Sequence, residues 1–278
     1  MGVTAPREIA DSVFWMGACR RMVVDGQPVH NHHSAYLIRG ASKTLLVDTS
    51  SPGFWPVLEA QLEAVLGDRR LDLVTPTHPE VAHAGNLAQL LEKYPAAELV
   101  GDVRDYHLYF PGLAARFRPL AVGQAVDLGG GRSFILLPAP IRDLPSSVWG
   151  YETGRRVMFV GDGFGFVHRG SPEADQDLPV HGPGECWLVS DELPAPPSVE
   201  LTEHVTRQAL VWSRFIDATA VLREVDDLME RYPPAVIGPA HGNVISNPAV
   251  VWPVIRSSFG RAFRAEAAFR PEAAVQAR

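Results

Sequence analysis

The chain has 278 residues, with 25 basic and 32 acidic side chains, a net charge of −7 and 46% hydrophobic residues. This composition is typical of a folded globular protein and excludes a disordered or collagen-like chain. The acidic balance argues against nucleic acid or an anionic membrane as a partner, because both bind basic surfaces.

Short apolar runs bounded by Gly or Pro predict strands, and apolar residues spaced three and four apart predict helices. In chain order the expected elements are strands at 36–38 and 44–48, a helix at 55–66, a strand at 71–74, a helix at 87–94, strands at 98–101, 133–137, 148–151 and 156–160, a helix at 202–231, a strand at 235–238 and a helix at 248–268. This alternation predicts a layered α/β fold. Residues 163–200 are rich in Gly and Pro and predict loops, and residues 271–278 a frayed tail.

The N-terminal residues include Arg7, Glu8 and Asp11 before any apolar run, which is unlike a signal peptide. We see no apolar stretch near the roughly 18 residues of a membrane span. Cys19 and Cys186 belong to no CxxC motif, so we expect two reduced, partly buried thiols. These features predict a cytoplasmic protein without a membrane partner.

Three polar clusters follow predicted strands, where α/β proteins usually place their sites. Their chemically active residues are His78, Glu80, His83, Asp162 and His241. Three imidazoles and two carboxylates suit a transition metal. Taken one at a time, however, a His or Asp beside a Gly is more often a turn or capping residue.

Together and in this order, the clusters resemble the metallo-β-lactamase superfamily. Residues 45–49 (LLVDT) are similar to its early LVDTG strand, and residues 78–86 (HPEVAHAGN) to its metal loop, HxHxDHxGN or HxExDHxGN. Asp162 matches the aspartate that bridges two metals, and His241 matches the last histidine. The resemblance implies an αββα sandwich. It also implies one domain over residues 1–278, since ligands from about 78 to 241 must converge on one site.

Glu80 stands where hydrolases of this superfamily usually have a second histidine. A glutamate there resembles the diiron branch, which includes flavodiiron and oxygen-binding diiron proteins. Residues 157–165 (VMFVGDGFG) are similar to the LFSGDAFG segment of that branch. A carboxylate in place of an imidazole favours iron or manganese over zinc. The resemblance therefore implies two iron ions, with manganese or zinc as alternatives.

Two positions depart from the family pattern. Ala82 replaces an aspartate of the metal loop, and Arg142 replaces a histidine in a segment like PxxHxPxS. A charged Arg side chain cannot ligate a metal. By resemblance, one metal would keep the ligands His78, Glu80 and Asp162. The other metal would keep His83, Asp162 and His241. Each metal would thus keep three protein ligands and open positions.

Several residues could take over a lost role. Asp143, or one of His30, His32 and His33, could be an extra ligand, although the histidine run could equally be a solvated or core-packing cluster. Arg142 could contact an anionic substrate group or pair with a nearby aspartate. The remaining histidines match no family position, and we expect them on the surface or in a lid: His168, His181 and His204.

The leading hypothesis is a diiron, oxygen-dependent oxidoreductase that hydroxylates a small organic substrate, such as a natural product. Its partners would be dioxygen and a separate electron-donating reductase, since 278 residues leave no room for a fused flavodoxin. A homo-oligomer is compatible with the sequence. Phe164, Phe166 and Trp187 could form an apolar lid within 163–200.

Two other classes of function stay open. A metal-dependent hydrolase, such as a lactonase or thioesterase, would use a metal-bound hydroxide. Ala82 counts against it, because the missing aspartate commonly orients that hydroxide. An oxygen-binding or non-catalytic module would fit the two lost ligands.

Overall fold

The computed structural model describes residues 6–169 and 185–267. Its first sheet has seven strands, whose order in the sheet is their order in the chain: β1 (Arg7–Ala10), β2 (Val13–Val24), β3 (Gln27–Arg39), β4 (Thr44–Val47), β5 (Leu73–Thr75), β6 (Glu98–Gly101) and β7 (Phe117–Pro119). Strands β1 to β4 pair antiparallel, and β4 to β7 pair parallel.

The second sheet has five strands, in the spatial order β12 (Val236–Gly238), β11 (Val157–Phe159), β10 (Val148–Glu152), β9 (Arg132–Pro138) and β8 (Ala125–Gly129). The α-helices are α1 (Trp55–Leu66), α2 (Val81–Ala84), α3 (Leu87–Lys93), α4 (Tyr106–Tyr109), α5 (Val199–Ala209), α6 (Thr219–Arg231) and α7 (Pro248–Ala267). Four short 3₁₀ helices are η1 (Pro52–Phe54), η2 (Pro111–Arg116), η3 (Glu185–Trp187) and η4 (Val211–Arg214).

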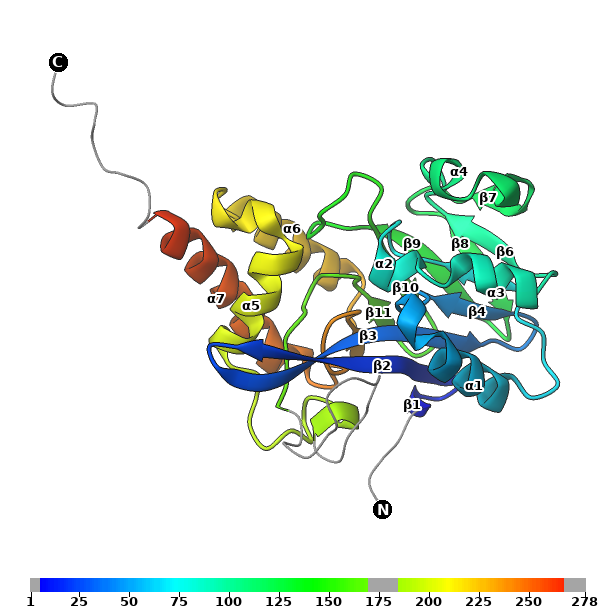
Figure 1. Ribbon diagram of the computed structural model, residues 1–278. Coiled ribbons are helices and arrows are strands. Elements are labelled where there is room, and N and C mark those ends of the chain that lie inside the picture. The colour runs from blue at the N-terminus through cyan, green and yellow to red at the C-terminus, as the bar shows by residue number, and fades with distance from the viewer. Residues whose placement is uncertain (1–5, 170–184, 268–278) are drawn as a thin grey trace, which may run out of the picture.

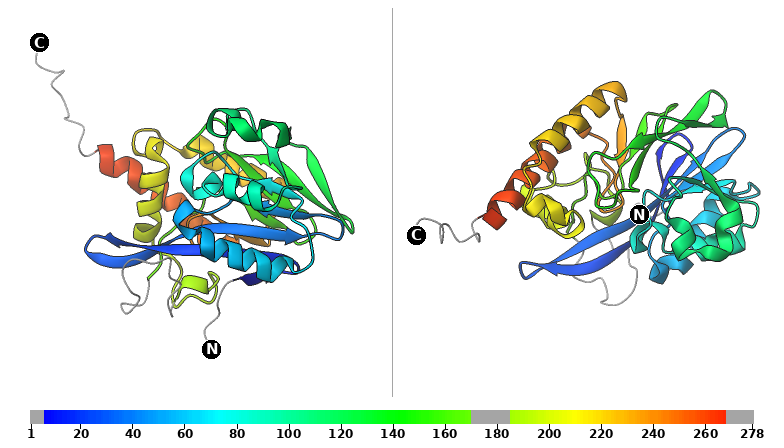
Figure 2. Two further views of the ribbon diagram at one scale, coloured as in Figure 1. Left: turned by 45° about the vertical axis from the view of Figure 1, so that its right-hand side comes forward. Right: turned by 90° about the horizontal axis from the view of Figure 1, so that it is seen from above.

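The two sheets lie between two groups of helices. Helices α1 and α3 cover one side, and α5, α6 and α7 gather on the other (Figure 1). Seen from above, the strands run between these groups (Figure 2). The αββα sandwich predicted from the sequence is therefore confirmed.

Three apolar clusters hold these layers together. The sheets face each other through Trp15, Tyr36, Phe134 and Phe159, all at most 1% exposed. Leucines of α1 and α3 pack on the first sheet, and Leu222, Val225 and Phe259 of α6 and α7 pack on the second. Burial of such side chains typically contributes about 1.5–3 kcal/mol each.

Most expected elements appear, but the helix expected over 202–231 is broken. Helix α5 ends at Ala209, because Leu210 leaves helical geometry with φ −114° and ψ 64°. Helix α6 begins only at Thr219, whose amide donates to the side chain of Asp217 at 2.9 Å. Asp217 thus forms an Asx turn directly before the new helix start.

The β2–β3 hairpin is the largest element that the sequence did not predict. Only residues 36–38 were expected as strand, and the histidines at 30–33 were expected before it. Strand β3 instead includes the whole run, paired with β2 from Val13↔Ile38 to Val24↔Gln27. Successive side chains of a strand point to opposite faces, so the four histidine-run residues divide between two environments.

None of the helices in the described ranges is long and apolar enough to cross a membrane.

Candidate metal centre

Five polar side chains converge from loops that follow strands of both sheets. His78, Glu80 and His83 follow β5, Asp162 follows β11, and His241 follows β12. Gly161 makes the turn before Asp162 with φ 51°, and a Cβ there would meet Thr77 Oγ1 at 3.0 Å. The tight approach of the two sheets at this turn brings the loops together.

Asp162 lies at the centre of this group. Its Oδ1 is 3.1 Å from His83 Nε2 and 3.3 Å from His241 Nε2. Its Oδ2 is 3.4 Å from His78 Nε2. Glu80 Oε2 lies 3.7 Å from the same His78 nitrogen. The carboxylate thus faces three imidazoles through both of its oxygens, as a bridging ligand would.

Two of these donor atoms are buried without a hydrogen-bond partner among the described residues, His78 Nε2 and Asp162 Oδ2. His78 is 3% exposed and Asp162 5%. Leaving such atoms unsatisfied typically costs about 1–3 kcal/mol each. A metal ion held by both would remove that cost, so the residues present fit the metal that the sequence predicts.

The orientation of His83 comes from a residue that the sequence analysis did not single out as functional. Nδ1 of His83 donates to Asp48 Oδ2 at 3.0 Å, since a carboxylate can only accept. Asp48 in turn accepts from the amide of Thr77 at 2.6 Å and from its hydroxyl at 2.9 Å. Hydrogen bonds of this kind fix the ring and aim the other nitrogen at the metal.

Asp48 belongs to the LLVDT segment quoted for the resemblance, and its position directly after β4 was the available signal. His241 is held in a similar way. Its Nδ1 donates to the backbone carbonyl of His32 at 2.8 Å, so Nε2 faces Asp162.

The electrostatics of the group favour a bound cation. Burial opposes charge on His83, but Asp48 and Asp162 outweigh it and raise the pKa of this imidazole well above 6.5. Burial likewise opposes the charge on Asp162, but His83 and His241 hold the pKa of its carboxyl well below 3.8. A proton and a metal ion therefore compete for the Nε2 side of His83.

Asp143 approaches the group where the family histidine is missing. Its Oδ1 lies 3.7 Å from His78 Nε2 and accepts from the amide of Leu144 at 2.7 Å. Burial, together with Asp162 and Glu80, raises the pKa of Asp143 above 3.8. A bound cation would instead favour the ionised carboxylate and lower this pKa. The distance from Asp143 to His78 is compatible with a ligand that replaces the missing histidine.

Arg142 lines a small pocket together with His78, Asp143 and Asp162. Its side chain is exposed and donates to the carbonyl of Ala139 at 3.2 Å. Ala82 lies in α2 at 8% exposure and brings no donor to the group.

The histidine run divides as the strand alternation requires. His33 flanks the metal group: its ring centroid is 5.2 Å from that of His241, and its Nδ1 is 2.5 Å from Ser51 Oγ. Burial and the neighbouring imidazoles of His241 and His83 lower the pKa of His33 to about 3. His30 and His32 contact Cys186 instead, so they are not extra ligands at this centre.

A cavity of about 390 Å³ opens beside the group and is lined by Met22, Asn31, Glu80, Asp162, His204, Val205, Gln208, Ala209 and His241. The outer half of the β2–β3 hairpin forms one side and α5 the other. The cavity exposes apolar and amide side chains next to three of the predicted ligands, Glu80, Asp162 and His241. Arg142 does not belong to its lining.

The three aromatic residues expected in a lid are core residues: Phe164, Phe166 and Trp187 are each at most 3% exposed. Of the histidines expected on the surface or in the lid, His168 is buried at 1% exposure and His204 lines the cavity. His181, residues 170–184 of the expected lid and the expected tail at 271–278 lie outside the described residues.

A comparison with protein families matches residues 30–241 to the metallo-beta-lactamase superfamily. Among curated proteins, the coenzyme F420H(2) oxidase of Methanothermobacter thermautotrophicus is 31% identical over 176 residues, which cover 57% of this chain and 41% of that protein. The anaerobic nitric oxide reductase flavorubredoxin of Aliivibrio salmonicida is 31% identical over 139 residues, or 48% of this chain and 27% of that protein. The matched part thus spans less than half of each relative.

Solved structures share the fold at lower identity. The flavodiiron protein from Giardia intestinalis superimposes with a TM-score of 0.69 at 18% identity, over 96% of this chain and 60% of that one. The rubredoxin oxygen:oxidoreductase from Desulfovibrio gigas gives 0.67 at 16% identity, over 94% and 61%. These matches fit the diiron branch that the sequence predicts.

Proposed function

Because the chain belongs to the metallo-beta-lactamase superfamily, we propose that its metal centre holds two iron ions and that the protein is an oxygen-dependent oxidoreductase. The observation that carries this proposal is the buried, unpaired pair His78 Nε2 and Asp162 Oδ2, 3.4 Å apart within a group of imidazoles and carboxylates. Such a donor set suits iron, and two bound iron ions would supply dioxygen activation.

The ligands divide into two sets around Asp162. His78 and Glu80 would hold one iron, with Asp143 in the place of the missing histidine. His83 and His241 would hold the other, in a two-histidine, one-carboxylate arrangement with open positions. Glu80, whose side chain is 51% exposed, lines the cavity and would hold its iron at the edge of it.

The finer proposal is a monooxygenase that acts on a small organic molecule. Met22, Val205 and Ala209 would contact the apolar part of the substrate, and Asn31 and Gln208 would orient its polar groups. Asp48 keeps His83 oriented while substrate enters, because its carboxylate is itself held by two hydrogen bonds. Electrons would come from a separate reductase.

The test begins with metal content after expression in iron-supplemented medium. We expect about two irons per chain, and consumption of dioxygen when a chemical reductant is supplied. Nitric oxide should be offered in parallel, since one relative is named a nitric oxide reductase. Faster turnover of nitric oxide than of dioxygen would contradict the oxygen-dependent assignment.

Two variants make this test specific. His83→Ala should lose iron and dioxygen consumption, whereas His107→Ala removes an exposed imidazole on α4 and should change neither. Zinc at the centre, with ester or lactone cleavage and no response to dioxygen, would contradict the proposal and support a hydrolase. A protein that takes up neither metal would support a binding module.

A further inference from the structure

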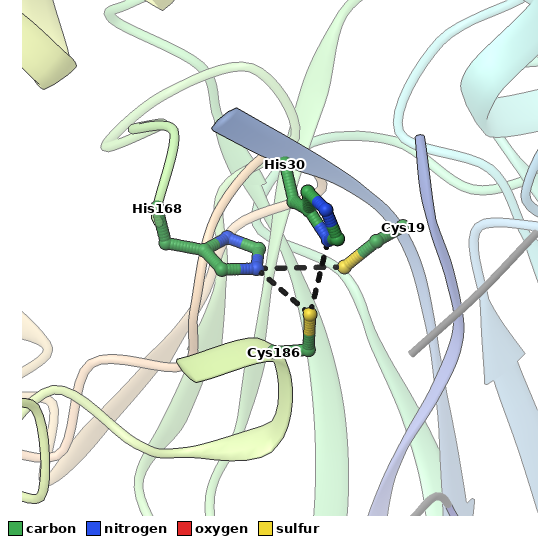
Figure 3. Close-up of side chains that lie close together, drawn as sticks. All are labelled: Cys19, His30, His168 and Cys186. Carbon is green, nitrogen blue, oxygen red and sulfur yellow. Dashed lines mark hydrogen bonds between the residues drawn. The ribbon is translucent and has the colours of Figure 1, made fainter. Parts of the chain in front are cut away.

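A second cluster of metal-binding side chains lies apart from the proposed iron centre. It consists of Cys19 on β2, His30 on β3, His168 after β11 and Cys186 in η3 (Figure 3). One donor atom from each lies within 4.8 Å of all the others. All four residues are at most 3% exposed. Neither the family match nor the proposed function accounts for this group.

The distances within the cluster are those of a tetrahedral site. His168 Nε2 lies 3.6 Å from Cys19 Sγ and 3.3 Å from Cys186 Sγ, and His30 Nδ1 lies 3.2 Å from Cys186 Sγ. A tetrahedral zinc ion with Zn–S of about 2.3 Å and Zn–N of about 2.0–2.1 Å separates its sulfur and nitrogen ligands by about 3.6 Å. Small shifts of these side chains would enclose the ion.

The ring of His168 has its polar contacts within the cluster. Nδ1 of His168 has no hydrogen-bond partner among the described residues, so the polar contacts of this ring are to the two sulfurs. Thiols are weak donors and acceptors, and they compensate poorly for the burial of an imidazole. Bound zinc would displace the two thiol protons and form metal–thiolate bonds in their place.

The backbone holds the donors in place from both sides. His30 and His168 exchange two backbone hydrogen bonds, at 2.8 and 3.0 Å, although they belong to distant segments. Cys19 is paired with His32 across β2 and β3, so it shares a face with His30. The ring of His32 stacks on that of His168 at 4.4 Å. Trp15 and Trp187 pack against the ring of His32 on its other sides.

From this geometry we propose that Cys19, His30, His168 and Cys186 form a closed, structural zinc site. Four protein ligands of the Cys₂His₂ type leave no open position, unlike the carboxylate-rich centre that would hold iron. The ion would join the β2–β3 hairpin to the chain before and after residues 170–184. This proposal does not depend on the proposed oxidoreductase activity.

The decisive measurement is X-ray absorption at the zinc edge on the full-length wild-type protein, purified without chelator. We expect about one zinc per chain, ligated by two sulfurs at about 2.3 Å and two nitrogens at about 2.0–2.1 Å. The sulfurs identify the site, because Cys19 and Cys186 are the only cysteines of the chain and neither lies at the iron centre. This measurement needs no variant and therefore holds even if substitutions prevent folding.

Variants then separate the two centres. Cys186→Ser should lose the zinc and retain iron, and His83→Ala should retain sulfur-ligated zinc whatever happens to its iron. His107→Ala should keep both metals.

Three results would overturn the zinc site: zinc with only nitrogen and oxygen ligands, a Cys19–Cys186 disulfide in the unreduced protein by mass spectrometry, or two free thiols in protein that takes up no added Zn²⁺. Sulfur ligation of another metal, such as copper, would overturn the choice of zinc.

Discussion

The two clusters use the same imidazole chemistry in different surroundings. At the proposed iron centre, His78, His83 and His241 meet carboxylates on loops, beside a cavity. At the proposed zinc site, His30 and His168 meet thiols, and all four residues are buried. Hard oxygen donors with open positions suit a reactive iron, and soft thiolates in a closed tetrahedron suit zinc. The comparison teaches that the partners of a histidine, and its access to solvent, decide its role.

Among the variants that would distinguish the iron centre from the zinc site, we expect the largest effect for Asp162→Ala. Since Asp162 faces all three imidazoles, its removal should abolish binding of both irons and leave the sulfur-ligated zinc in place. Metal analysis of the purified variant measures both. Loss of the zinc as well would show that the two centres are not independent.

Asp143→Ala should have the next largest effect. If Asp143 replaces the missing histidine ligand, iron content should fall from about two per chain to about one. Asp226→Ala is the matched control, because it removes a carboxylate that binds Trp252 and Arg256 between α6 and α7, away from the loops. Unchanged iron content in Asp143→Ala would remove it from the ligand set.

Asp48→Asn should weaken iron binding without abolishing it. Loss of such an orienting partner typically costs about 10–100-fold in metal affinity. Asp72→Asn, which disturbs a carboxylate bonded to the amide of Thr44 at the opposite end of the parallel strands, should leave affinity unchanged. Competition with chelators of increasing affinity measures the iron affinity of both variants. Equal losses in the two variants would point to general destabilisation.

Ala209→Phe should have the smallest effect on the proposed iron centre, because it changes only the cavity beside it. It should narrow the cavity on its α5 side, leave both metals bound and raise the KM for an organic substrate roughly tenfold. Dioxygen consumption without substrate should be unchanged. An unaltered KM would place the organic substrate elsewhere.

The sequence predicted the proposed iron centre better than its surroundings, for a physical reason. His78, Asp162 and His241 each lie three residues past the end of a strand, and the carboxyl ends of strands gather at one edge, so strand positions together with the family resemblance pointed to them. Asp143 could be suggested only by its neighbour Arg142, because its approach to His78 depends on how the intervening loop folds.

The second cluster could not be predicted from local pattern. Cys19 and His30 become neighbours only through the register of a hairpin whose outer half mixes polar and apolar residues without clear alternation. Cys186 and His168 join them through tertiary packing. His30 and His32 were considered as ligands of the proposed iron centre because the sequence did not predict that they lie in a strand. Without that strand, the side of the sheet to which each ring points could not be assigned.

The hydrogen bonds that orient His241 and His83 differ in how easily a mutation can remove them. The partner that orients His241 is the main-chain carbonyl of His32, whereas the partner that orients His83 is the side chain of Asp48. No single codon change at position 32 can delete a carbonyl, but one at position 48 can delete a carboxylate. Mutational robustness is therefore unequal across the centre, and random mutagenesis should recover changes that weaken iron binding at Asp48 more often than at His32.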